Sequence, residues 1–173
     1  MIVLKFGGTS VGTSSALEQV KNIVMAHQEP VIVVVSALGG MTDQLVELMQ
    51  MDSRSSKVTE MLDAFGCRYA NLISAMIDES IQPQVRTDIN RLLRELQKDI
   101  GNAPRDTYFQ DKIISYGERL SSVFVSRLFG AKTPCWYRSW IWCRHLQTTA
   151  VWTGTSLLAE SMTISVTMML TYT

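Results

Sequence analysis

The sequence predicts an α/β fold in which helices pack on both faces of a mainly parallel sheet. Residues 2–6 are β-forming apart from Lys5, and this short run stops at Gly7-Gly8, as a strand does where it enters a tight loop. Residues 31–35 are five consecutive β-branched residues, the continuous apolar pattern of a strand that is covered on both faces. A segment with helical spacing separates the two runs, which makes a right-handed strand–helix–strand unit with parallel strands.

The glycine loop after the first run is a candidate anion site. Such a loop can bring bare backbone N–H groups up to an anion, and Lys5 adds a positive charge beside it. The spacing from Gly7 to Gly12 matches the two glycines of a P-loop, but Thr13 stands where that motif needs lysine, and no G-x-G-x-x-G occurs. The residues alone leave two interpretations open: a phosphate loop, or a strand–helix turn whose glycines serve only sterics.

A helix should follow this loop and lead back to the sheet. Ser15 and Glu18 have the spacing of a capping box, which predicts the start of the helix. The buried face of this helix is expected to comprise Leu17, Val20, Ile23 and Val24. Parallel strands place their C-terminal loops at one edge of the sheet, where open α/β sheets bind ligands. Residues 36–40 should therefore meet Gly7-Gly8.

Three more helices are predicted before residue 102. Thr42 is expected to cap the first of them, and an apolar stripe over residues 58–77, methionines included, is expected to face the core in the second. Pro83 separates this stripe from a third helix with an apolar stripe over residues 85–100, which should end near Gly101. The charges between the apolar positions of the third helix are expected on a solvated face: Arg86, Asp88, Arg91, Arg94, Glu95 and Lys98.

A last helix is predicted over residues 107–129, and Gly117 lies inside it. Glycine in a helix costs about 1 kcal/mol relative to alanine, so either another segment approaches the backbone closely there or the helix breaks. Glu118 and Arg119 follow at once. Adjacent helical residues do not face one another, so these two are not simply an ion pair. From the pattern alone, two exposed charges are the favoured interpretation over a ligand-binding pair.

Composition excludes several classes of function. The chain of 173 residues suits one domain, and its 16 basic and 16 acidic residues cancel, so we expect neither nucleic acid nor an anionic membrane as a partner. Cys67, Cys135 and Cys143 are an odd number without a C-x-x-C pair, which argues against a disulfide framework or a zinc site and fits a reducing cytosol. No secretory signal or membrane span is recognised, so a cytoplasmic location is expected.

Residues 133–173 differ in character from the rest. They contain all four tryptophans and two of the three cysteines, lack lysine and aspartate, and show no sustained period. We interpret this tail as out-of-frame or otherwise aberrant sequence, with a lineage-specific extension as the alternative. We expect it to pack poorly, or to contact another copy of the chain through its tryptophans, which would give a homo-oligomer.

Three stretches, in this order, resemble the aspartokinases of the amino acid kinase family: Lys5–Val11 (KFGGTSV), Val33–Asp43 (VVVSALGGMTD) and Ile114–Ser122 (ISYGERLSS). The resemblance covers residues 1–132. It implies a three-layer sandwich with a mainly parallel sheet, here incomplete, because the glycine-rich GRGGSD-like nucleotide segment of the family has no match. It also implies transfer of the γ-phosphoryl group of ATP, accompanied by Mg²⁺, to the β-carboxylate of L-aspartate, the first step towards lysine, threonine and methionine.

The resemblance also suggests residue roles. Lys5 would be catalytic and would offset charge on the transferring phosphoryl group. Gly7 and Gly8 would offer backbone N–H groups, and Ser10 its hydroxyl, to the phosphates. The residues matching the aspartate site are Thr42 and Glu118, with Ser36 and Arg119 expected at the same mouth. No carboxylate can be singled out as a metal ligand.

Two alternatives remain open from the sequence. Another amino acid kinase would use a different acceptor, such as glutamate or carbamate, but the Glu118-Arg119 stretch favours aspartate. A non-catalytic fragment would bind an anion or a partner chain and turn nothing over. The missing nucleotide segment favours this second alternative for the chain as it stands, which we expect to be truncated and inactive alone.

Overall fold

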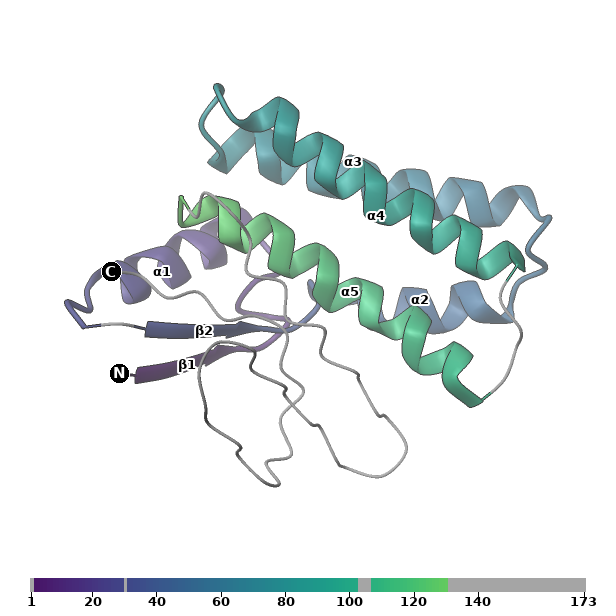
Figure 1. Ribbon diagram of the computed structural model, residues 1–173, viewed down its shortest axis with the longest axis horizontal. Coiled ribbons are helices and arrows are strands. Elements are labelled where there is room, and N and C mark those ends of the chain that lie inside the picture. Colours follow the sequence, from purple (N-terminus) through teal and green to yellow (C-terminus); the bar gives the residue numbers. More distant parts are fainter. Residues whose placement is uncertain (1, 30, 103–106, 131–173) are drawn as a thin grey trace, which may run out of the picture.

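The computed structural model describes residues 2–29, 31–102 and 107–130 (Figure 1). The elements follow the order β1 (Ile2–Phe6), α1 (Ser14–Met25), β2 (Val31–Val35), α2 (Met41–Gln50), α3 (Ser56–Met76), α4 (Gln82–Asn102) and α5 (Thr107–Leu128). The expectations for residues 133–173 lie outside the described residues. Within the described ranges, no helix is both long enough and apolar enough to cross a bilayer.

The two strands pair in parallel, as predicted. Their register runs from Ile2 opposite Val31 to Phe6 opposite Val35, and the N–H of Ser36 continues the ladder by donating to the carbonyl oxygen of Phe6 at 3.1 Å. Residues 33–35 are all buried, so both faces of β2 are shielded, as the continuous apolar run predicts. The described part of the chain thus contains one parallel strand pair of an α/β fold. The complete three-layer sandwich stays a prediction.

The start of α1 corrects the capping prediction. The N-cap is Thr13, whose backbone is extended (φ −134°, ψ 159°) and whose side chain accepts from the N–H of Ala16 at 3.2 Å. Because the helix already includes Ser14, the predicted capping box at Ser15 is wrong. The predicted burial of Ile23 is also wrong, since this side chain is 47% exposed.

The start of α2 differs from the prediction as well. The N-cap is Gly40 rather than Thr42, and no side chain caps this helix. Gly40 takes a φ of 78°, which glycine adopts without the Cβ penalty of other residues, and the turn is closed by the N–H of Met41 donating to Leu38 at 2.9 Å. Thr42 therefore lies exposed in the first turn of α2, with its side chain outside the capping interaction.

The three long helices form the main body of the described core. Helix α4 packs against both α3 and α5, and α2 packs against α5 (Figure 1). The predicted stripe residues of α3 and α4 are buried: Val58, Leu62, Phe65, Tyr69, Leu72, Ile73, Ile77, Val85, Ile89, Leu92, Leu93, Leu96 and Ile100. Met61 and Met76 are partly buried and pack against this core.

The polar face of α4 is less solvated than predicted. Asp88 pairs with Arg127 of α5 at 3.2 Å, and both side chains are only about 15% exposed. Glu95 pairs with Arg119 of α5 at 2.7 Å, and Arg86 donates to the Ser74 hydroxyl of α3 at 2.7 Å. The prediction was wrong for Asp88, which flanks the apolar stripe within reach of α5, whereas the Glu95 side chain is 40% exposed and the hydrogen bond of Arg86 is exposed.

Candidate functional site

The loops that follow β1 and β2 touch each other. A Cβ atom added at Gly8 would lie 2.9 Å from the carbonyl oxygen of Ala37, and one added at Gly39 would lie 3.2 Å from the carbonyl oxygen of Gly8. A side chain at Gly8 would force the loops to shift, and one at Gly39 would require a smaller displacement of Gly8. The expectation that the two loops meet at one edge of the sheet is confirmed, and the reason is the parallel pairing of the strands.

The loop after β1 is built from two tight turns. The N–H of Ser10 donates to the carbonyl oxygen of Gly7 at 3.0 Å, and that of Gly12 donates to Thr9 at 3.4 Å. Gly7 is exposed and Gly8 is half-buried. Lys5 is exposed on the strand that leads into these turns, so its ammonium and the backbone of the loop are both accessible to a solute. An accessible glycine backbone beside a cation suits an anionic ligand.

Helix α5 closes against the second loop at Gly117. A Cβ atom there would lie 2.7 Å from the Cβ atom of Ala37 and 3.3 Å from a methyl group of Leu45. The expectation that another segment approaches the helix backbone at this position is confirmed, and the helix continues unbroken through it. Glu118 is the next residue, so its backbone lies beside the loop after β2 and the start of α2.

Glu118 is the most unusual ionisable group of this region. Its side chain is largely buried, and its Oε2 atom has no hydrogen-bond partner. Burial raises the pKa of this carboxyl to about 7, because removal from water penalises the charged form. Buried polar groups are nearly always hydrogen-bonded, and a carboxyl left unpaired in a perturbed state is a recognised mark of a functional position. The alternative of an exposed surface charge is wrong for Glu118.

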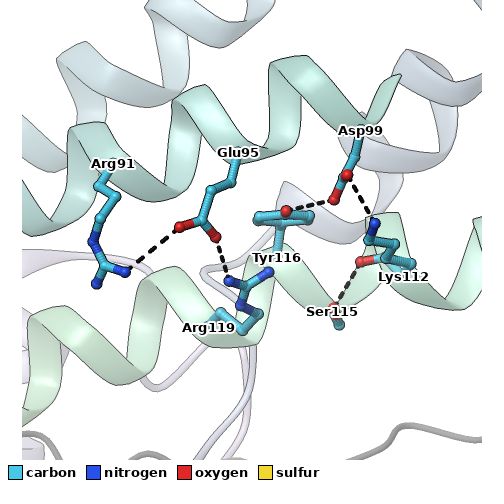
Figure 2. Close-up of polar contacts among 7 residues, drawn as sticks. All are labelled: Arg91, Glu95, Asp99, Lys112, Ser115, Tyr116 and Arg119. Carbon is cyan, nitrogen blue, oxygen red and sulfur yellow. Dashed lines mark hydrogen bonds and ion pairs between the residues drawn. The ribbon is translucent and has the colours of Figure 1, made fainter. Parts of the chain in front are cut away.

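Arg119 belongs to a network between α4 and α5 (Figure 2). Its guanidinium pairs with Glu95 at 2.7 Å and lies 4.2 Å from the centroid of the Tyr116 ring. The Tyr116 hydroxyl donates to Asp99 at 2.7 Å, and Lys112 pairs with the same carboxylate at 2.7 Å. Residues 112, 116 and 119 lie on one helical face, so this network limits the rotation of α5 about its axis. The rotation of α5 in turn determines where the backbone of Gly117 lies and in which direction the Glu118 side chain points.

Arg68 of α3 was not identified from the sequence. One nitrogen of its guanidinium donates to the carbonyl oxygen of Gly39 at 3.0 Å, and another donates to that of Gly12 at 3.2 Å. The residue thus contacts both loops from a helix that follows them in sequence. Its only sequence signal is its place beside Tyr69 at the flank of the α3 apolar stripe, and that signal does not single it out.

A buried polar contact links three helices at the start of α2. The Tyr69 hydroxyl is 3.3 Å from the hydroxyl oxygen of Ser121 and 3.9 Å from the sulfur of Met41. Burial raises the pKa of this phenol well above its usual range, so it stays neutral and acts as a structural link among α2, α3 and α5.

The structure brings most of the predicted site residues to one region. Lys5, Gly7, Gly8 and Ser10 lie on β1 and its loop, and Ser36 and Thr42 lie on either side of the second loop. Glu118 lies on α5, directly after Gly117, which packs against that loop. The Arg119 side chain is engaged with α4. In the described residues, no group of three or more His, Cys, Asp or Glu side chains is arranged to hold a metal ion.

Comparisons with known proteins show the family to which the chain belongs. Residues 1–136 match the model of the amino acid kinase family. An aspartokinase of Chlamydia muridarum is 33% identical over 126 residues, which are 72% of this chain and 26% of that protein. The lysine-sensitive aspartokinase 3 of Escherichia coli is 30% identical over 126 residues, which are 71% of this chain and 27% of that protein.

Solved structures agree with this family assignment. The crystal structure of E. coli aspartokinase III in complex with lysine and aspartate matches with a TM-score of 0.65 at 27% identity, over 76% of this chain and 29% of that one. The structure of the same enzyme in complex with aspartate and ADP matches with a TM-score of 0.64 at 27% identity, over 78% and 30%. This chain therefore spans between a quarter and a third of the length of these relatives.

Proposed function

Because this chain belongs to the amino acid kinase family, we propose that it forms the acceptor-side part of an aspartate kinase, which transfers the γ-phosphoryl group of ATP to the β-carboxylate of L-aspartate. The product, 4-phospho-L-aspartate, would enter the synthesis of lysine, threonine and methionine. The observation that carries the proposal is the buried, unpaired Oε2 atom of Glu118, the residue after Gly117, whose backbone packs against the loop that follows β2. The aspartokinase relatives and the aspartate-bound structures of E. coli aspartokinase III support it.

The chemistry of this reaction suits the residues that are present. The side-chain carboxyl of aspartate has a pKa near 3.9, so the acceptor is already ionised at neutral pH and needs no general base. The site has to align two anions and to offset their charge. Lys5 would offset charge on the transferring phosphoryl group, while Gly7 and Gly8 would offer N–H groups and Ser10 its hydroxyl to the phosphates.

Glu118 is the proposed partner of the aspartate ammonium. A cation that entered the site would give the buried Oε2 atom the partner it lacks and would favour the ionised carboxylate. Thr42, exposed in the first turn of α2, would add a hydroxyl to the amino acid. Ser36 and Arg119 remain predicted residues of the same aspartate site. The contacts of Arg119 with Glu95 and Tyr116 support an indirect contribution through the orientation of α5.

ATP fits the loop after β1 because an accessible glycine backbone and a lysine are what a phosphate chain needs. The ATP would supply the phosphoryl group that is transferred. The described residues offer no cluster of metal ligands, so no side chain is assigned to Mg²⁺, which in such reactions contacts the phosphates themselves.

Isothermal titration calorimetry with L-aspartate tests the proposal on the purified chain. We expect weak binding by the wild type and no detectable binding by Glu118→Ala, since the ammonium would lose its counter-charge. Glu60→Ala, at an exposed position of α3, is the matched control and should bind as the wild type does. Succinate, which has the two carboxylates but no ammonium, should not bind, whereas equal binding of succinate and aspartate would contradict the role of Glu118.

The alternatives give different results in the same titration. Preferential binding of L-glutamate or carbamate would identify a different acceptor within the family. Binding of tripolyphosphate without binding of any amino acid would favour a non-catalytic anion-binding fragment. The absence of a recognisable nucleotide segment from the sequence is the observation that favours this fragment.

A further inference from the structure

We propose that Arg68 is a positioning residue of this site, which holds the loop after β1 and the loop after β2 at a fixed separation. The proposal rests on the proposed function, because the two loops carry the residues assigned to the phosphoryl group and to the acceptor. Its evidence is the pair of hydrogen bonds from one guanidinium to the carbonyl oxygens of Gly39, at 3.0 Å, and Gly12, at 3.2 Å.

Contact and attachment together define the separation of the loops. The loops already touch at Gly8, Gly39 and Ala37, so they cannot move closer. The hydrogen bonds of Arg68 oppose their movement apart. A guanidinium suits this task because its donors form a rigid planar fork that can serve two acceptors at once, whereas a lysine ammonium is a point charge on a flexible stem.

The separation matters for phosphoryl transfer. Lys5, Gly7, Gly8 and Ser10 lie on one side of the contact, and Thr42 follows the loop on the other side. Transfer requires reacting atoms about 3–3.5 Å apart, and a misplacement of about 1 Å can cost roughly 100-fold in rate. By holding the two loops together, Arg68 would therefore affect the alignment of two ligands without contacting either.

The fold itself should tolerate loss of this side chain. The neighbouring stripe residues of α3, Phe65 and Tyr69, are fully buried and anchor the helix independently. Gly12 and Gly39 are half-buried, so water can replace the guanidinium at their carbonyl oxygens. The effect of Arg68 on ligand alignment can thus be separated from an effect on folding.

Amide hydrogen exchange of the full chain tests directly whether the hydrogen bonds of Arg68 hold the two loops together. In Arg68→Met, the amides of Ser10 and Met41, which close one turn in each loop, should exchange at least about fivefold faster than in the wild type. The amide of Ser55, in a turn away from both loops, should not change. Arg94→Met, at an exposed position of α4, is the matched control. Unchanged exchange at Ser10 and Met41 in Arg68→Met would overturn the proposal.

Calorimetry tests the consequence for ligands. Arg68→Met should bind L-aspartate and tripolyphosphate about tenfold more weakly, with a thermal midpoint close to that of Arg94→Met, and Arg68→Lys should recover only part of the affinity. Full recovery by lysine, or wild-type affinity in Arg68→Met, would overturn the positioning role while leaving the proposed function intact. If the wild type bound no aspartate, the proposed function would fail and the positioning role with it. The exchange rates would then still decide whether Arg68 ties the loops.

Discussion

Glu118 is the residue whose surroundings oppose its own ionisation most clearly among the candidate site residues. Its carboxyl lies largely out of water, has an oxygen without a hydrogen-bond partner and has a raised pKa, all of which oppose ionisation in the free protein. Leaving a charge unpaired in such a place destabilises the fold. A residue of this kind is consistent with selection for binding rather than for stability.

The pH dependence of stability should reveal this penalty. The pKa of Glu118 is about 7 in the folded chain, against about 4.3 in an unfolded one, so the folded state holds the extra proton between these values and stability falls as pH rises through this window. Compared with Glu118→Gln, the wild type should lose about 2 kcal/mol of unfolding free energy between pH 5 and pH 8.

Urea denaturation at both pH values measures this difference, because the other titrating groups are common to the two proteins and cancel. Equal pH dependence of wild type and Glu118→Gln would mean that the carboxyl is ionised normally in the folded chain.

Lys5 makes a second prediction at the scale of a residue. In a full-length relative that carries this N-terminal sequence, Lys5→Ala should lower kcat much more than it raises the KM for aspartate, because a charge that offsets the moving phosphoryl group acts mainly in the transition state. The loss should be about 2.7–4 kcal/mol, or roughly 100- to 1,000-fold. Steady-state kinetics with both substrates varied would check it. A change confined to the KM for aspartate would place Lys5 on the acceptor side instead.

Helix α5 organises the site at the scale of elements. One face carries Tyr116 and Arg119 against α4, while Gly117 presses on Ala37 of the loop after β2. Both contacts limit rotation of the helix, and Glu118 lies between them in sequence. The direction of the Glu118 carboxyl is therefore set by packing on two sides of the same helix.

Two glycine-to-alanine substitutions in helices should have opposite effects. At Gly66 of α3 an added Cβ atom would meet Leu93 at an ordinary 3.5 Å, so Gly66→Ala should stabilise the chain by up to about 1 kcal/mol through helix propensity. At Gly117 the added atom would lie 2.7 Å from the Cβ atom of Ala37, and overpacking of this kind typically costs about 1–3 kcal/mol. Thermal unfolding should show a higher midpoint for Gly66→Ala and a lower one for Gly117→Ala. A rise in both would show that α5 and the loop can separate without cost.

At the scale of the whole molecule, the proposal assigns to the described residues one side of a two-substrate reaction. It places the phosphates and the acceptor at their two loops, while the chain spans between a quarter and a third of the length of its aspartokinase relatives. Phosphoryl transfer requires both substrates to be held in line. A partial set of contacts can bind a ligand without turning it over.

The purified chain of 173 residues should therefore show no aspartate-dependent ATP turnover. The reason is the absence from its sequence of a recognisable segment for the adenosine moiety. A coupled assay for ADP, with a full-length aspartokinase as positive control, provides the measurement. Sustained ADP release that requires aspartate would mean that the chain builds a nucleotide site from residues that the sequence motifs do not reveal.

Features with a local or periodic signal could be predicted from the sequence. The parallel strands follow from two short apolar runs around a helix, and the close approach at Gly117 follows from the cost of glycine inside a helix. The caps at Thr13 and Gly40 were missed because they depend on φ and ψ at single residues, and several side chains near them could have served. Arg68 was missed because its acceptors are backbone carbonyls distant in sequence, which no side-chain pattern marks.

The glycine contact between the two loops has a consequence for protein engineering. A surface made of backbone atoms cannot be retuned by exchanging side chains, and a larger residue at Gly8 would collide with the carbonyl oxygen of Ala37. Libraries that aim at a new phosphate donor should therefore yield few functional variants at Gly8 and Gly39. Changes of acceptor should be far more accessible, because the proposed acceptor contacts of Thr42 and Glu118 use side chains that can be replaced one at a time. Directed evolution of such a chain would be expected to change the residues around the proposed acceptor site while the loop after β1 stays almost unchanged.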